Sequence, residues 1–231
     1  MTDHESATGG AISENITTRW LKEKAEVLWA GQEMARRGLV VGSSGNVSLK
    51  VEEGLIAITP HGAYYDELIA EDIVVINAAG EAQEGQRVPS AESLLHSAIY
   101  KARPDVKAII HTHSLFASAL AVAGKEIPPI LDDQMTYLGG DIKLAPYALP
   151  GTADLIPAVA AALGKKNAVL IANHGALGVG GSLKHALTNC LMLEKVAQVY
   201  VFASSLGRIN QLSPQAEEAL KVYFTMLQDS K

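Results

Sequence analysis

Short apolar stretches alternate with amphipathic ones along most of the chain, and together they predict a mixture of strands and helices. Apolar runs of strand length occupy residues 47–51, 55–59, 73–76, 108–111, 142–145, 168–172 and 176–179. Amphipathic segments with helical spacing and capping residues occupy 17–37, 90–101, 114–123, 152–163, 182–205 and 213–228. No internal repeat or linker interrupts this order, so we expect one domain over residues 17–231. The polar residues 1–16 before it are expected to form a flexible N-terminal tail.

The predicted strands and helices indicate an α/β fold with helices on both sides of a central sheet. Several strand pairs are joined by turns too short for a parallel crossover, such as Glu53-Gly54. We therefore expect the sheet to be largely antiparallel.

The composition is that of an ordinary soluble globular protein, with 48% hydrophobic and 19% charged residues in a chain of 231. The net charge of −6 and the lack of a Lys/Arg-rich stripe argue against a nucleic-acid partner. Cys190 is the single cysteine, so an internal disulfide is excluded and a reducing cytoplasm is the expected compartment. No segment has the pattern of a signal peptide or a membrane span, so no membrane partner is expected.

Three histidines at strand ends are the strongest indication of chemistry. His111 and His113 close an apolar run, and side chains two apart on a strand point to the same face. His174 follows the apolar run 168–172 in the same way. Each could simply hydrogen-bond to backbone, but a same-face pair with a third strand-end histidine favours a metal site. Three neutral imidazoles with one open position form the ligand set of a catalytic zinc or a similar divalent ion.

Glu92 is the candidate acid or base beside this site. It lies in the first turn of the helix predicted from Ser90, where a capping role is the alternative. A capping box needs the acid three residues after the cap, and Glu92 is only two after Ser90. A carboxylate beside a metal can act as a fourth ligand or transfer a proton. His96, one helical turn later, is equally well explained as a core residue or as a support of the site.

Two glycine-containing turns are weaker candidates for substrate binding. The Gly/Ser-rich turn 42–48 contains Ser44, Gly45 and Asn46, and its N–H groups and hydroxyls could hold a phosphate or sugar oxygen. It lacks the lysine and spacing of a nucleotide P-loop. The turn 59–62 contains His61, which could bind an anion or a metal. For both turns a plain connection remains the alternative.

Taken in order, these segments resemble the class II aldolase/adducin family from about residue 20 to residue 228. The matching stretches are Ser-Gly-Asn-Val-Ser at 44–48, Ile-Thr-Pro-His-Gly at 58–62, Pro-Ser-Ala-Glu at 89–92, Arg-Pro-Asp-Val at 103–106 leading to His-Thr-His at 111–113, Ala-Pro-Tyr-Ala at 145–148 and Asn-His-Gly at 173–175. The family includes zinc-dependent aldolases, epimerases and dehydratases. The resemblance implies a three-layer α/β/α sandwich, usually assembled as a homotetramer with active sites at subunit interfaces.

The resemblance also implies roles for individual residues. His111, His113 and His174 match the zinc ligands, and Glu92 matches the carboxylate that ligates the resting metal and acts as acid and base. Gly45 and Asn46 match the donor-binding turn, and Gly62 and Ser90 match parts of the phosphate grip. Ser44, which begins the matching stretch 44–48, is also expected to bind substrate.

Three positions depart from an aldolase of the family. His61 stands where that aldolase has a hydroxyl residue, and Ala91 stands where it has a second serine. Asp132 falls at the position of a tyrosine thought to donate a proton from the neighbouring subunit. The predicted metal centre is unaffected by these departures, whereas they bear on the phosphate contacts and on the identity of the aldehyde.

The predicted chemistry is the metal-dependent cleavage of a C–C bond. Zn²⁺, or Mn²⁺ or Co²⁺ in its place, would bind adjacent hydroxyl and carbonyl oxygens and stabilise the enediolate left by retro-aldol cleavage of a ketose phosphate. The same enediolate serves decarboxylation of a keto or hydroxy acid, which is the main alternative, followed by epimerisation or dehydration. A non-catalytic adducin-like scaffold would be expected to lack metal ligands. An amidohydrolase would need a (β/α)₈ barrel, and a cupin is all-β, so neither fits the predicted elements.

Overall fold

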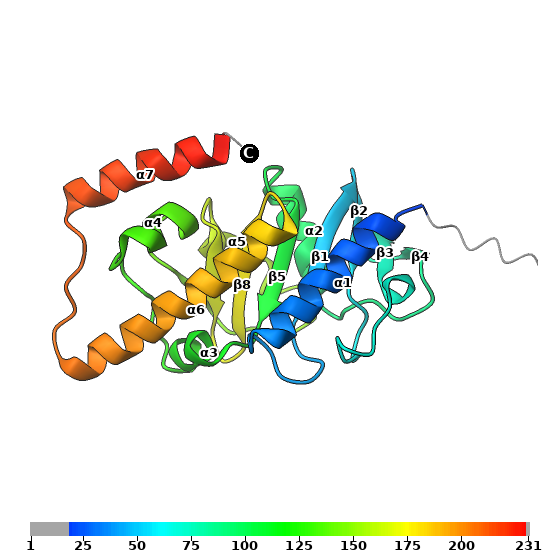
Figure 1. Ribbon diagram of the computed structural model, residues 1–231, viewed down its shortest axis with the longest axis horizontal. Helices are drawn as coiled ribbons and strands as arrows, with labels where there is room; N and C mark the ends of the chain where they lie inside the picture. The colour runs from blue at the N-terminus through cyan, green and yellow to red at the C-terminus, as the bar shows by residue number, and fades with distance from the viewer. Residues whose placement is uncertain (1–18, 230–231) are drawn as a thin grey trace, which may run out of the picture.

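An eight-stranded sheet forms the centre of the computed structural model, which describes residues 19–229 (Figure 1). Its strands are β1 (Asn46–Glu52), β2 (Leu55–Ile58), β3 (Val74–Asn77), β4 (Ala82–Glu84), β5 (Ala108–Thr112), β6 (Leu144–Ala145), β7 (Ala168–Ile171) and β8 (Gly175–Gly180). Across the sheet the order is β4-β3-β2-β1-β5-β8-β7-β6. Each neighbouring pair is antiparallel except β6 and β7, which are parallel. The largely antiparallel sheet is thus confirmed.

Helices cover both faces of the sheet. They are α1 (Leu21–Arg36), α2 (Ser93–Ala102), α3 (Leu115–Val122), α4 (Asp132–Leu138), α5 (Leu155–Leu163), α6 (Leu183–Leu206) and α7 (Pro214–Asp229), with a 3₁₀ turn η1 (Ala70–Asp72). Alternate strand residues point to opposite faces. Ile110 packs in one core cluster with residues of α1 and α6, whereas its neighbour Ile109 packs in another with residues of α2 and α5. This division produces the expected three-layer α/β/α sandwich.

The predicted helix starts were less accurate than the strands. The helix expected from Ser90 begins at Ser93, because the Ser90 hydroxyl accepts a hydrogen bond from the Glu92 N–H within a preceding turn. The helix expected from Thr152 begins at Leu155. Ser182 caps α6 as predicted, since its side chain accepts a hydrogen bond from the His185 N–H. The start expected at 17 or 18 and the tail 1–16 lie outside the described residues.

One strand and one α-helix were not predicted at all, and neither was the short 3₁₀ turn η1. β4 is a polar edge strand without hydrophobic alternation, and α4 spans only seven residues between a proline-containing loop and Gly139. Neither the spacing of apolar residues nor their number distinguishes such short elements from loops. None of the helices in the described part of the chain combines the length and apolar character needed to cross a bilayer.

Candidate metal centre

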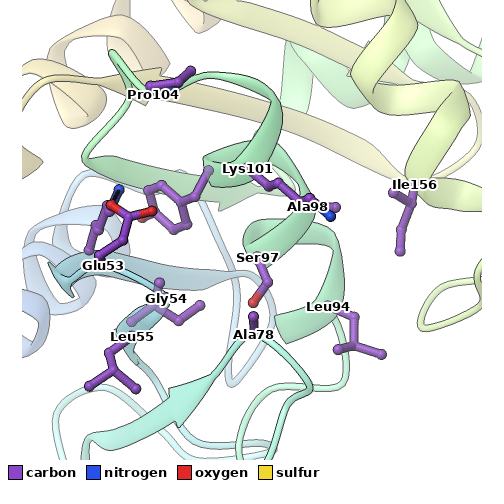
Figure 2. Close-up of a pocket in the computed structure, with 13 residues that line it drawn as sticks. Glu53, Gly54, Leu55, Ala78, Leu94, Ser97, Ala98, Lys101, Pro104 and Ile156 are labelled. Carbon is purple, nitrogen blue, oxygen red and sulfur yellow. Dashed lines mark hydrogen bonds and ion pairs between the residues drawn. The ribbon is translucent and has the colours of Figure 1, made fainter.

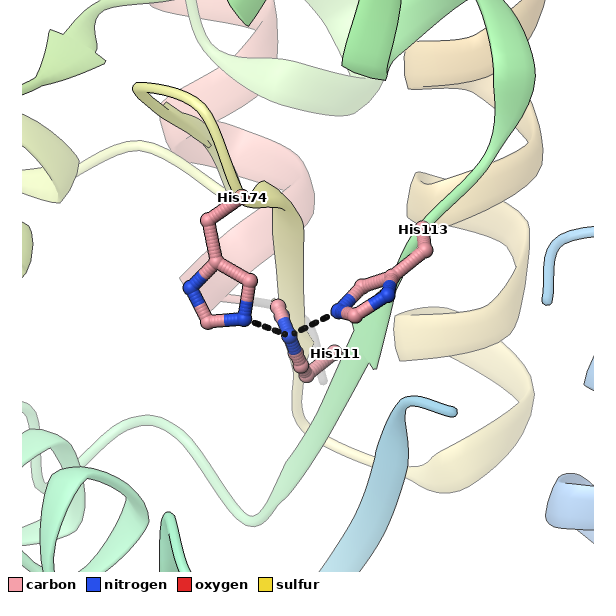
Figure 3. Close-up of side chains that lie close together, drawn as sticks. All are labelled: His111, His113 and His174. Carbon is pink, nitrogen blue, oxygen red and sulfur yellow. Dashed lines mark hydrogen bonds between the residues drawn. The ribbon is translucent and has the colours of Figure 1, made fainter. Parts of the chain in front are cut away.

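The three predicted histidines meet where two neighbouring strands come together (Figure 3). His111 lies in β5 and His113 directly follows it, whereas His174 lies in the turn between β7 and β8. The ladder pairs Thr112 with Ala176, so the end of β5 lies beside the start of β8. The antiparallel pairing of β5 with β8 therefore brings His174 to a pair of histidines more than sixty residues earlier in the chain.

One nitrogen of each imidazole faces the other two. His111 Nε2 lies 2.9 Å from His113 Nε2 and 3.1 Å from His174 Nε2. The ring planes are inclined to one another by 68–78°, so the rings are not stacked. Because a ring nitrogen carries its lone pair in the ring plane, inclined rings can direct three lone pairs to one point. Nitrogens about 2.05 Å from a tetrahedral zinc ion would lie roughly 3.3 Å apart, which is close to these separations.

Hydrogen bonding and burial prepare His111 to act as a ligand. Its Nδ1 lies 2.9 Å from the carbonyl oxygen of Ala176, which can only accept a hydrogen bond, so the proton sits on Nδ1 and the Nε2 lone pair is free. Burial lowers the pKa of His111 to about 4. Burial also lowers the pKa of His113, with a further contribution from His174. Both rings are therefore neutral at neutral pH, as metal coordination requires.

The Glu92 carboxylate completes the group from the other side. Its Oε2 lies 3.3 Å from His111 Nε2, and its Oε1 lies 3.6 Å from His174 Nε2. Burial alone would raise the pKa of this carboxyl, but His111, His174 and a hydrogen bond from Asn46 bring the pKa below its ordinary value. Oε1 is buried without a hydrogen-bond partner among the described residues.

These donors fit a divalent cation. A lone pair on His111 Nε2 cannot accept two well-aligned hydrogen bonds at once, and a buried carboxylate oxygen without a partner is unfavourable. A cation among the nitrogens and the carboxylate would satisfy all of these groups. Within the part of the chain that the structure describes, His111, His113 and His174 form a group able to hold such an ion.

The predicted glycine-containing turn at 44–46 lies directly against the metal centre. Gly45 has a φ of +73°, and an added Cβ would lie 2.6 Å from the His111 carbonyl oxygen, so only glycine fits. The Tyr65 hydroxyl donates to the Gly45 carbonyl at 2.8 Å, and the Ser44 hydroxyl donates to a neighbouring carbonyl. Asn46 donates its amide hydrogen to Glu92 Oε2 at 2.8 Å. The structure thus assigns Asn46 a contact with Glu92 that the sequence did not predict.

The other predicted substrate-binding segments lie next to each other. The His61 N–H donates to the Val88 carbonyl at 2.9 Å, and the Ser90 N–H donates to the Thr59 carbonyl at 3.2 Å. His61 and Gly62 are exposed, and Gly62 has a φ of +67°. Because Glu92 lies two residues after Ser90, the segment that contains Ser90 continues into the metal centre.

Asp132 is not part of this cluster within one chain. It is exposed in the first turn of α4. Among the described residues, no hydrogen bond or ion pair connects it with Glu92 or the three histidines. Its predicted role in the site stays a prediction.

Comparison with known proteins gives consistent matches over most of the chain. A family model described as Class II Aldolase and Adducin N-terminal domain matches residues 25–201. The 5-deoxy-D-ribulose 1-phosphate aldolase of Bacillus thuringiensis serovar kurstaki is 36% identical over 204 residues, which cover 88% of this chain and 95% of that protein. A 3-oxo-tetronate 4-phosphate decarboxylase of Pectobacterium atrosepticum is 32% identical over 203 residues, covering 86% and 90%. A solved L-fuculose 1-phosphate aldolase structure superposes with a TM-score of 0.84 at 33% identity, covering 88% of this chain and 96% of the other.

Proposed function

Because the chain belongs to the class II aldolase and adducin family and is a metal-dependent aldolase-type lyase, we propose that it cleaves a ketose 1-phosphate by a retro-aldol reaction with zinc as its ion. The observation that carries this proposal is the convergence of three imidazoles beside a buried carboxylate, with His113 Nε2 and His174 Nε2 both about 3 Å from His111 Nε2. In this arrangement His111, His113 and His174 would hold the ion, and Glu92 would be its fourth ligand in the resting enzyme. The same donors would also accept Mn²⁺ or Co²⁺.

When bound, the ion supplies Lewis acidity to the hydroxyl and carbonyl oxygens of the substrate. Glu92 moves the proton. Its lowered pKa keeps it ionised at neutral pH, so it acts as the base that removes a proton from the substrate carbon when the C–C bond forms. In the direction of cleavage a proton leaves the substrate hydroxyl as the C–C bond breaks, and the protonated form of Glu92 gives a proton to the same carbon. The hydrogen bond from Asn46 to Oε2 leaves Oε1 as the oxygen available for this transfer.

A phosphorylated ketose is the proposed substrate class. Two of the similar proteins are named as aldolases of 5-deoxy-D-ribulose 1-phosphate and L-fuculose 1-phosphate. The proposed binding surface joins the two turns beside the metal centre, and its members are Ser44, Gly45, Asn46, His61, Gly62 and Ser90. We further propose that Asp132 acts on the site of a neighbouring copy in a homotetramer with active sites at its interfaces.

A decarboxylase acting on a keto or hydroxy acid is the second candidate. It is supported by the similarity to a 3-oxo-tetronate 4-phosphate decarboxylase. It is also supported by His61, an exposed imidazole near the site that could bind a carboxylate. Loss of carbon dioxide would leave the same kind of carbanion for Glu92 to protonate, so the two activities need the same metal centre.

The deciding experiment supplies the zinc-loaded protein with a panel of ketose 1-phosphates and phosphorylated keto acids. We expect dihydroxyacetone phosphate and an aldehyde from a ketose 1-phosphate, whereas carbon dioxide from a keto acid would support the second candidate. Chelation should abolish turnover, and added zinc should restore it. A protein that binds no divalent metal, or that turns over after complete chelation, would contradict both candidates.

Two variants separate metal binding from proton transfer. His111→Ala should lose both bound metal and turnover, whereas Glu92→Gln should largely keep the metal and lose about 10²–10⁴-fold in rate. His185→Gln, a histidine of α6 outside the metal centre, serves as the matched control and should change neither. An active Glu92→Gln enzyme would contradict the role proposed for this carboxylate.

We also propose that residues 17–231 act as a single domain in the cytoplasm, without a nucleic-acid or membrane partner. The compartment is supported by the use of a single cysteine, Cys190, which is buried. Burial raises the pKa of its thiol to about 12, so the thiol stays protonated at neutral pH in the folded protein.

A further inference from the structure

Two rows of polar side chains face each other between α2 and β1. Glu92 and the α2 residues His96 and Tyr100 follow one another at four-residue intervals, which places them on one side of the helix. Asn46 and Ser48 lie two residues apart on β1, so they point to the same face of the sheet. The first members of the two rows are Glu92 and Asn46, which belong to the metal centre.

Each row is hydrogen-bonded to the other. Asn46 Nδ2 donates to Glu92 Oε2 at 2.8 Å. One layer further on, Ser48 Oγ lies 2.7 Å from His96 Nδ1 and 2.8 Å from the Tyr100 hydroxyl oxygen. Ser48 and His96 are both fully buried, and Tyr100 is 6% exposed. We call Ser48, His96 and Tyr100 the buried polar chain.

The buried polar chain lies within an otherwise apolar layer. Tyr100 belongs to a core cluster that also contains Leu95 and Ile99 of α2, Ile109 of β5 and Ile56 of β2. Apolar contacts are non-directional, so they hold α2 on the sheet without fixing how far it is shifted along its own axis. Buried polar groups are different, because a small shift leaves them without partners in a medium where that is costly.

From this we infer that Ser48, His96 and Tyr100 are positioning residues that fix α2 along β1 and thereby hold the Glu92 carboxylate against the three histidines. The inference rests on the proposed function, since it gives Glu92 its role as acid and base. None of the three residues forms a hydrogen bond or ion pair with the histidines of the metal centre among the described residues, so their effect passes through Glu92 and the first turn of α2.

Helix α2 also offers a matched control. A cavity of about 610 Å³ lies between α2 and the β1–β2 hairpin, and Tyr100 and Ser97 are among its lining residues (Figure 2). The Ser97 side chain points toward Ala78 in this view, and its Oγ has no hydrogen-bond partner among the described residues. Ser97→Ala thus removes a hydroxyl from the same helix without breaking a bond to β1.

The test compares variants of the full-length, metal-loaded protein at equal folded fraction. Ser48→Ala and His96→Leu should each lower kcat about tenfold or more, the size typical of residues that support a metal site. Tyr100→Phe should lower it about threefold. KM should stay within about twofold, because none of these side chains lies on the proposed substrate surface. His96→Asn, which keeps a polar atom near the position of Nδ1, should recover most of the loss, and Ser97→Ala should behave as the parent.

A second measurement does not depend on turnover. Amide hydrogen exchange of residues 92–96 should become about tenfold faster in Ser48→Ala and stay unchanged in Ser97→Ala. If Ser48→Ala and Tyr100→Phe lose thermal stability but keep the parent kcat and exchange rates, the buried polar chain is merely structural and the inference is overturned. Should His96→Leu fail to fold, the Ser48 and Tyr100 variants still decide. A different result would show that the proposed function itself is wrong. In that case the Glu92→Gln enzyme would be active.

Discussion

Replacing Gly175 with alanine tests whether the strand pairing at the metal centre sets its geometry. Gly175 is the first residue of β8 and directly follows His174. A Cβ added there would lie 2.3 Å from the Thr112 carbonyl oxygen and 2.8 Å from His113 Cδ2. Ordinary contacts of this kind are about 3.5 Å, so β5 and β8 would have to separate by roughly 1 Å. The Thr112 backbone on one side and the His113 ring on the other leave no flexible group to absorb this shift.

The expected magnitude follows from two opposing effects. Overpacking of this kind lowers the free energy of unfolding by about 1–3 kcal/mol. Alanine also restricts the unfolded chain, and the lower entropy of that state raises the free energy of unfolding by about 0.4–1 kcal/mol. We therefore expect Gly175→Ala to lower the free energy of unfolding of the metal-free protein by about 1–2 kcal/mol. Metal affinity should fall by about one to two orders of magnitude, because displacement of His113 separates the three nitrogens.

Urea denaturation of the metal-free protein measures the first effect, and competition with a chromogenic chelator measures the second. Gly181→Ala is the control, since a Cβ at Gly181 would meet nothing within 4 Å and its φ is not positive. That variant should match the parent in both assays. A Gly175→Ala protein with parental stability and parental metal affinity would show that the close approach of β8 to Thr112 does not determine the site.

Two further predictions concern buried ionisable groups. The unfolded chain binds a proton at His111 near pH 6.5, whereas the buried ring resists protonation down to about pH 4. His111 should therefore contribute about 3 kcal/mol to the fall in the free energy of unfolding of the metal-free protein as the pH drops through this window. In urea titrations His111→Gln should remove this contribution and leave that of His96 and His113, whose pKa values burial also lowers. Elsewhere, Lys24 is 4% exposed and pairs with Glu84 at 2.6 Å. Glu84→Gln should cost about 3 kcal/mol by leaving the ammonium unpaired, and the double variant with Lys24→Met should recover much of it; equal stability of Glu84→Gln and the parent would refute this.

Local patterns were sufficient to predict most of the sheet and the three strand-end histidines that meet at its edge. The runs ending at His111 and before His174 are apolar over a strand's length and are bounded by glycine or polar residues, so their ends were visible without tertiary information. The connections between several strands are too short for a crossover, which predicted antiparallel pairing. These features depend only on residues near each other in the chain.

The features that the sequence did not predict depend mainly on contacts between residues far apart in the chain. Asn46 was predicted to bind substrate. Its hydrogen bond to Glu92 could be predicted only from the knowledge that the N-terminal end of α2 lies over β1. For the same reason His96 could be either a core residue or a support of the site. Its partner, Ser48, lies forty-eight residues earlier, and the sequence offered no evidence that the two are neighbours. The start of α2 was misplaced because a serine before a helix can cap it or bond within a preceding turn, as Ser90 does.

At the metal centre the fold brings together groups whose lone pairs repel one another. Three imidazole nitrogens and a carboxylate lie within about 3.6 Å of their neighbours in a buried environment, and Gly45 and Gly175 allow the backbone to approach closely enough for this. Without a cation, this arrangement leaves lone pairs opposed and Glu92 Oε1 without a partner. The surrounding apolar clusters and the buried polar chain must therefore hold the donors in place before the ion binds. An ion that binds only the folded state then adds its binding energy to stability, so metal affinity and the rigidity of α2 should change together in variants of Ser48.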